Sequence, residues 1–409
     1  MHLLTRILNG ISRIPEEVSR ETFLSEQMGL WKVEGTMKFV MITFVVLLIC
    51  SCGDDFEESN PVESAAADTL HYLVPYDSIG VGTGNSCYIF GDVLECCVFP
   101  DGSIGVLDWS ITTVKFYSPE GEYIQEFRPE GNGYGEFRGL NRLDCDDSGI
   151  MMLADLYGGK LAWFDREFSL IEELVFTSQE GVSPRCVYPL SDMGFIGFTP
   201  VFQYPDSAGC EIALFRGSDN PEIIYRRRMA FYDPSGNYQK ATFMVFTTDQ
   251  NGRVYIADRS EDTFNIACYS PEGEYLYCIE RPYEPVRRPQ EEIDSSFEFA
   301  RQNWIERNGS AEGFNLEPTE YHPSVHTMMV DGRGRLWVKG AGEDKIFHVF
   351  SDTGEYLHDC TLVVPDWQET DGWAVNIGPR GIVANTLYPE QYPVVYMLEE
   401  VIEVVPSSE

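Results

Sequence analysis

The sequence is poor in basic residues and in long hydrophobic runs. Only 29 of its 409 residues are Lys or Arg, against 66 Asp or Glu, so the formal net charge is −37. A body this acidic repels phosphate backbones, which makes nucleic acid a poor partner. No stretch reaches the roughly 20 apolar residues that a membrane-spanning helix requires. With 43 % hydrophobic and 13 % aromatic residues, however, the chain has ample material for a folded core.

Cysteine pairs with metal-ligand spacing are absent too. Of 11 cysteines, Cys50 and Cys52 lie in an N-terminal segment, and the other nine are spread thinly over the rest of the chain. An odd, dilute set does not make a disulfide scaffold. No C-x-x-C motif occurs, so a zinc site of that kind has no support.

A short apolar run near the N-terminus has the features of a lipoprotein signal peptide. Lys38 precedes 11 mostly apolar residues from Phe39 to Ile49, which fits a signal-peptide h-region. The run ends in Ile49-Cys50-Ser51-Cys52, which resembles a bacterial lipobox. We therefore predict a signal peptide over residues 37–51 and lipidation at Cys52. The alternative is an ordinary secretory signal with two incidental cysteines.

The segments on either side of this signal do not read as folded domains. Residues 1–36 are mixed in charge, so we expect translation to start at Met37 and no function before it. Residues 52–69 are acidic and rich in Ser, Ala and Pro, as in a solvated tether. An acidic cluster directly behind the lipidated cysteine resembles the surface-export signal of Bacteroidota lipoproteins. We predict an outer-membrane lipoprotein, exposed at the surface or facing the periplasm.

An internal repeat organises the rest of the chain. Each copy opens on a turn with glycine, followed by a β-rich run. The six copies begin at Asp101, Asp147, Asp192, Asn251, Arg333 and Arg380. Their glycines are spaced by 47, 45, 58, 82 and 47 residues, close to the roughly 40–50 residues of a four-stranded propeller blade. The two long intervals hold insertions.

Further patterns place strands and one helix. YSPEGEYI from Tyr117, YSPEGEYL from Tyr269 and FSDTGEYL from Phe350 predict tight hairpins whose glycine takes a positive φ. Residues 290–307, inside the insertion 281–320, have the apolar spacing of an amphipathic helix. Helical periodicity is otherwise almost missing.

These units predict an all-β fold, a six-bladed β-propeller over residues 70–405 with four-stranded antiparallel blades and one helical insertion between blades. The ring must close to protect its last strand edge. We expect Ser86–Cys97 and Val394–Val405 to meet in one composite blade.

The string GNGYGEF from Gly131 to Phe137, followed by a strand, D-x-x-G and an apolar run ending in Ala-Asp, resembles the NHL-type repeat. The opening DSIGVGTGNSCYIFG from Asp77 to Gly91, together with the lipobox, resembles the six-bladed β-propeller lipoproteins of Bacteroidota, NHL-like or TolB-like. The resemblance implies the fold and an envelope location. It implies no reaction, because its motifs are structural.

Two classes of function remain open. One is a binding or scaffolding propeller for an extracellular glycan, peptide or partner protein, and the other is a metal-dependent propeller enzyme of the lactonase or lyase type. Such enzymes place His, Glu, Asn or Asp around the axis. The histidines that follow the signal are His71, His322, His326, His348 and His358. On a strand, His322 and His326 would lie about 13 Å apart, too far to share an ion. The sequence thus predicts no catalytic residue, metal ligand or cofactor, and favours binding.

The predicted ligand-binding residues share one face of the propeller. Loops between second and third strands lie there with the blade-to-blade crossovers, while the glycine turns and hairpins lie on the opposite face. The residues are aromatic platforms and charged groups that suit sugars or acidic peptide ends. They are Trp109, Tyr157, Arg259, Glu261, Lys345 and Tyr388 in the loops, and Arg287, Arg288 and Trp304 in the crossover insertion. The alternative is that they are ordinary loop residues and that Trp304 docks the helix.

Lipidation requires the thiol of Cys52. The Cys52→Ala protein should therefore no longer partition with membranes, whereas Cys50→Ala should behave as the wild type. Membrane and soluble fractions compared by immunoblot check this, and equal membrane association of both variants would contradict the lipoprotein interpretation.

Overall fold

The computed structural model describes residues 29–33, 36–40, 69–176, 184, 186–203, 207–217, 220–231, 244–314, 318–340, 342, 345–365, 372–387, 389 and 391–404. Cys50, Cys52, the predicted tether up to Asp68, and Tyr388 lie outside them. The chain divides into a smaller unit, Met1–Val46 with Val286–His322, and a larger unit, Leu47–Pro285 with Pro323–Glu409. Each unit is described by itself.

Four separate four-stranded antiparallel sheets follow one another along the larger unit. The first comprises β4 (Val93–Val98), β5 (Ile104–Asp108), β6 (Thr113–Tyr117) and β7 (Tyr123–Phe127). The second comprises β8 (Arg142–Cys145), β9 (Met151–Asp155), β10 (Lys160–Phe164) and β11 (Leu170–Val175). The third comprises β12 (Cys186–Pro189), β13 (Phe195–Gln203), β14 (Ser207–Phe215) and β15 (Ile223–Phe231). The fourth comprises β16 (Met244–Thr248), β17 (Val254–Asp258), β18 (Phe264–Tyr269) and β19 (Tyr275–Arg281).

The remaining strands form one eight-stranded sheet, in the order β20-β21-β22-β23-β3-β26-β25-β24. Its first half is β20 (Thr327–Val330), β21 (Leu336–Lys339), β22 (Ile346–Phe350) and β23 (Tyr356–Leu362). Its second half is β3 (Thr69–Ile79), β26 (Val395–Val404), β25 (Gly381–Thr386) and β24 (Trp373–Gly378). A short parallel contact joins the halves, in which Cys360–Leu362 pair with His71–Leu73. The fold is therefore all-β and propeller-like, with four separate sheets and one double sheet.

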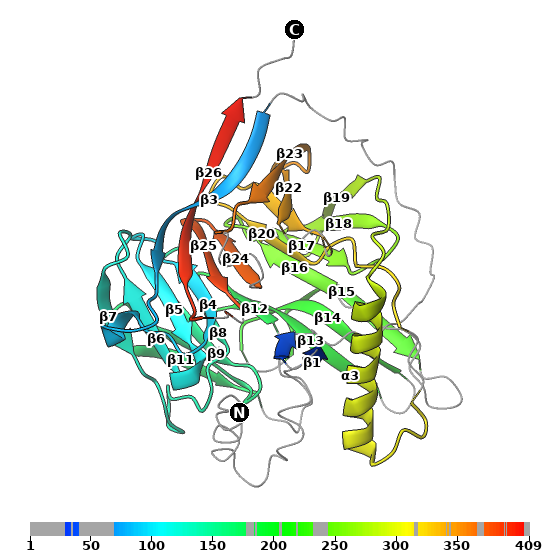
Figure 1. Ribbon diagram of the computed structural model, residues 1–409, viewed down its shortest axis with the longest axis horizontal. Coiled ribbons are helices and arrows are strands. Elements are labelled where there is room, and N and C mark those ends of the chain that lie inside the picture. Colours follow the sequence, from blue (N-terminus) through cyan, green and yellow to red (C-terminus); the bar gives the residue numbers. More distant parts are fainter. Residues whose placement is uncertain are drawn as a thin grey trace. The chain divides into compact units, whose positions relative to one another are not determined.

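The closing strand differs from the sequence prediction. Residues 395–404 of β26 pair antiparallel with β3 over its whole length, from Val395–Ile79 to Val404–Thr69, as Figure 1 shows with β3 in blue beside β26 in red. Ser86–Cys97 does not take this place, because Ser86–Tyr88 forms the 3-10 turn η1 and β4 pairs with β5. The C-terminal strand was predicted correctly, but its partner was not: only Leu73 and Ile79 of β3 are buried, so its sequence reads as continuous with the preceding tether.

The predicted hairpins are confirmed, and they share one hydrogen-bonding pattern. In the first, the Ser118 Oγ accepts from the backbone N–H groups of Glu120 and Glu122 at 3.2 and 3.3 Å. Ser270 makes the same two contacts at 3.2 and 3.3 Å, and Ser351 makes them at 3.2 and 3.0 Å. The glycine of the first hairpin, Gly121, has φ 78°, a conformation that a side chain would strain.

The core of the larger unit lies between neighbouring sheets. Among the described residues, six hydrophobic clusters each combine side chains of two consecutive four-stranded groups. One packs Leu107 and Val114 of the first sheet on Leu153 of the second, and another packs Val395 of β26 on Val106 of β5. The first strands come together: β4 contacts β8 and β24, and β20 contacts β16 and β24. Each sheet therefore buries both faces against its neighbours.

The smaller unit holds the insertion. Its elements are the antiparallel pair β1 (Gly29–Val33) and β2 (Thr36–Val40) and the helix α3 (Gln290–Asn308). The helix confirms the prediction for residues 290–307. It ends at Gly309, whose φ of 76° is the left-handed cap typical of a helix C-terminus. Of the residues that the structure describes, no helix is long and apolar enough to cross a membrane.

Removing the residues after Leu387 should abolish cooperative folding, because β3 and β25 then lose their shared partner β26 and expose strand edges. Calorimetry or circular dichroism melting checks this. A chain that ends at Val404 keeps every described strand and is the matched control. A soluble, cooperatively melting 1–387 chain would contradict the role of β26 in closure.

Candidate functional site

The predicted loop residues follow the second strands of their sheets. Trp109 begins the turn η2 (Trp109–Ile111) after β5, and Tyr157 follows β9 with 43 % of its surface exposed. Arg259 and Glu261 follow β17, and Lys345 directly precedes β22. These residues therefore lie in equivalent loops of four different sheet groups.

Among the described residues, none balances the charge of Arg259. Its Nε is buried, and no hydrogen bond or ion pair reaches the guanidinium from any described residue. Burial lowers the pKa of Arg259, because leaving water disfavours the charged form. An unpaired, partly desolvated cation reduces stability, so this side chain is suited to an anionic group supplied from outside the chain.

Two further arginines share the carboxylate that precedes Arg259. The Nη2 atoms of Arg226 and Arg228, both on β15, each lie 2.6 Å from Asp258 Oδ2. One carboxylate thus pairs with two guanidinium groups where the third and fourth sheets meet.

The crossover residues belong to the smaller unit and contact the insertion itself. The Arg288 guanidinium donates to Glu292 Oε1 at 2.8 Å, to Ser296 Oγ at 2.9 Å and to the Thr319 carbonyl at 3.1 Å. Arg287 is exposed, with its Nη2 3.7 Å from Glu320 Oε2. Arg288 therefore ties the start of α3 to the segment that returns from it.

Trp304, on α3, has a similar local role. Its indole N–H donates to the Glu312 carbonyl at 3.3 Å, and its ring lies 6.2 Å from that of Phe314. These contacts agree with the alternative that Trp304 docks the helix. His322 also belongs to this unit, with its Nε2 3.4 Å from Glu292 Oε2, whereas His326 belongs to the larger unit.

A charged cluster on the inner strands was missed by the sequence prediction. Arg142 on β8 donates from Nη1 to Glu95 on β4, and its Nη2 lies 3.2 Å from Asp144 Oδ2. The Leu143 N–H donates to Glu95 Oε2 at 2.7 Å. The guanidinium also lies 5.1 Å from the ring centre of Tyr188 on β12, so three consecutive sheets meet here. The sequence signal for this cluster was the charged Glu95 within the otherwise apolar string VLECCV.

Two carboxyl groups share one guanidinium in this cluster, and the side chains of Arg142 and Glu95 keep only 19 % and 15 % of their surface exposed. Burial raises the pKa of Glu95 to about 7, and Arg142 and the Leu143 N–H only partly oppose this. Burial likewise raises the pKa of Asp144. The cluster can therefore bind or release a proton near neutral pH.

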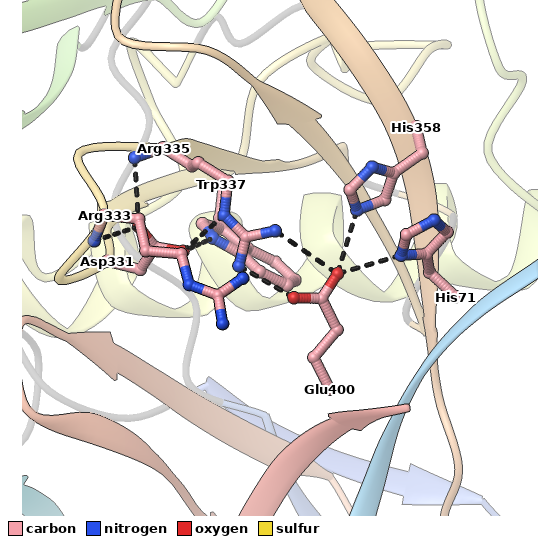
Figure 2. A network of polar contacts seen from close by, with 7 residues as sticks. All are labelled: His71, Asp331, Arg333, Arg335, Trp337, His358 and Glu400. Carbon is pink, nitrogen blue, oxygen red and sulfur yellow. Dashed lines mark hydrogen bonds and ion pairs between the residues drawn. The ribbon is translucent and has the colours of Figure 1, made fainter. Parts of the chain in front are cut away.

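A second group missed from sequence is a set of two histidines and a glutamate. His71 on β3, His358 on β23 and Glu400 on β26 offer donor atoms that all lie within 4.8 Å of one another (Figure 2). The expectation of no metal site rested on sequence spacing, and these residues come together only through the pairing of three strands.

No family model matches the sequence, and no curated protein matches it. Among solved structures, the chain is similar to a member of the DUF4221 family from Bacteroides vulgatus, with a TM-score of 0.45 and 11 % identity over 85 % of this chain and 100 % of that chain. An exported protein from Bacteroides fragilis gives a TM-score of 0.44 and 12 % identity, over 84 % and 98 % of the two chains. Virginiamycin B lyase from Staphylococcus aureus gives 0.37 and 8 %, over 84 % and 90 %.

The raised pKa of Glu95 predicts a pH-dependent stability. The folded state favours the neutral form of Glu95. The stability that this preference contributes is therefore fully present below the unfolded pKa of 4.5 and is lost as the pH rises to about 7. This shift corresponds to at most about 3 kcal/mol. The free energy of unfolding of the wild type should therefore fall between these pH values when compared with that of Glu95→Gln. Denaturant titration of both proteins measures this.

The matched control is Glu122→Gln, because Glu122 is an exposed carboxyl group on a hairpin. Its difference from the wild type should not change over the same range. If the difference in free energy of unfolding between the wild type and Glu95→Gln is also independent of pH, Glu95 is ionised throughout this range.

Proposed function

We propose that this protein is an envelope-anchored lipoprotein whose six-bladed β-propeller binds an extracellular ligand, a glycan, peptide or partner protein, through an anionic group of that ligand. The predicted lipobox at Cys52 supports the anchor. The loops after the second strands provide the binding face.

The count of six blades is supported by the pattern of strand pairing. The eight-stranded sheet is held together at its middle by a parallel contact of three residue pairs. If it is divided there, β20–β23 form a fifth four-stranded blade and β24–β26 with β3 form a sixth. The six interface clusters, each shared by two consecutive blades, agree with this division.

The observation that carries the binding function is the unpaired guanidinium of Arg259. A bound carboxylate would supply the hydrogen bonds and the charge that Arg259 lacks within the described chain. Trp109 and Tyr157, in the equivalent loops of the first two sheets, add aromatic surfaces on which sugar rings or peptide side chains can pack.

A metal-dependent enzyme is the competing class. It requires inner-strand donors that are free to bind an ion. Glu95 and Asp144, the carboxylates carried by the described first strands, are both bound to Arg142. Their oxygens are thus engaged with a cation of the chain, which supports binding over metal catalysis at the axis.

The test is a binding screen of oligosaccharides with and without uronic acids and of short peptides with free or amidated C-termini, followed by calorimetry. We expect carboxylate-bearing probes to bind. Arg259→Gln should weaken binding by about 10–100-fold, because a hydrogen bond to a charged group contributes roughly 1.5–3 kcal/mol. Trp109→Ala and Lys345→Ala should weaken binding less.

Glu122→Gln and Glu274→Gln, in hairpins on the opposite face, are the controls and should bind as the wild type does. Loss of binding confined to these two variants would show that the ligand binds the hairpin face and not the proposed loop face. Binding that is indifferent to the carboxylate of the probe would rule out the anionic group as the feature recognised.

A further inference from the structure

Three strands that are distant in the sequence bring two imidazoles and a carboxylate together. His71 Nδ1 lies 2.9 Å and His358 Nε2 lies 3.1 Å from the same oxygen, Glu400 Oε1. The side chains of His71, His358 and Glu400 keep only 10 %, 16 % and 11 % of their surface exposed. Figure 2 shows both rings turned towards this one carboxylate oxygen.

A second layer of contacts holds the carboxylate in place. Arg335 Nη2 donates to Glu400 Oε2 at 2.7 Å, and Nη1 makes a longer contact of 3.3 Å with Oε1. The Nε of Arg335 donates to Asp331 Oδ2 at 2.7 Å, and the Trp337 indole N–H donates to the same oxygen at 3.0 Å. The Arg335 guanidinium, which Asp331 holds in place, therefore fixes Oε2 of Glu400, while Oε1 faces the two imidazoles.

We propose that His71, His358 and Glu400 bind a divalent transition-metal ion, with zinc as the ion that their donors suit best. Two imidazole nitrogens and one carboxylate oxygen form a common zinc ligand set, with water as the fourth ligand. Ligands at about 2.0–2.2 Å around a tetrahedral ion are separated by about 3.4 Å. The observed nitrogen-to-oxygen distances of 2.9 and 3.1 Å are close to this value.

Binding requires one local change. The two imidazole rings are stacked, with centroids 3.5 Å apart and planes inclined by 12°, so the lone pairs of the two nitrogens lie in nearly parallel planes. To point at one ion the rings must tilt apart through rotation of the His71 and His358 side chains. Glu400 can stay where it is, because Arg335 holds it from the Oε2 side, as partners of metal-binding carboxylates do.

The ion would cross-link the ring at its closure. It would join β3 to β26 and also to β23, where the backbone contact is only three residue pairs long. Metal-binding free energy then adds to the stability of the closed ring. This role is structural and does not depend on the ligand proposed for the loops.

The experiment uses the full chain, stripped with a chelator and dialysed against zinc chloride. We expect about one zinc per chain by elemental analysis and a melting temperature that rises with zinc concentration. His71→Ala and His358→Gln should each lower the bound zinc to less than about a tenth at the same free zinc concentration. His348→Ala is the control, because His348 pairs with Asp359 on the same sheet, outside the cluster, at 2.6 Å.

Absence of bound zinc and of any zinc-dependent melting shift in the wild type would overturn the proposal, whether or not the variants fold. Equal zinc content in the wild type and His71→Ala would overturn it too, because the ion would then lie elsewhere. X-ray absorption gives a further check. The expected shell contains nitrogen and oxygen only, and a sulfur ligand at about 2.3 Å would assign the ion to a cysteine such as Cys360 instead.

Discussion

The pairing of β3 with β26 is the constraint on which the rest of the larger unit depends. Each four-stranded group packs apolar side chains against the groups before and after it, in six clusters among the described residues. An unclosed ring would therefore leave two apolar faces and two strand edges in water, and β3 prevents this by occupying the edge of β26.

Arginine has an unusually large role for so acidic a chain. Arg142 joins carboxylates of the first and second sheets, Arg335 joins the turn before β21 to β26, and Arg226 with Arg228 joins the third sheet to Asp258 of the fourth. Arg142 and Arg335 each bind two carboxylates through the planar guanidinium, whereas Arg226 and Arg228 share one. No described carboxylate forms an ion pair with Arg259, whose Nε is buried.

Features that depend on local sequence patterns could be predicted from the sequence. The hairpins at Ser118, Ser270 and Ser351 are specified by local turn chemistry, and the helix at residues 290–308 by its spacing. Contacts between distant strands could not be predicted in this way. His71 and Glu400 are separated by 329 positions, and nothing in the sequence around β3 marks it as a closing strand. The candidate metal ligands became visible only once the pairing partner of β26 was known.

The position of β3 also has a mechanical consequence. Thr69, the first residue of β3, pairs with Val404 at the end of β26, so tension on the preceding chain enters the ring at this pair. Pulling along the strand loads the hydrogen bonds of all ten residue pairs together in shear, whereas pulling across it opens them one by one from Thr69. His71 lies two residues from the point of load, so its contact with Glu400 is among the first to bear the force.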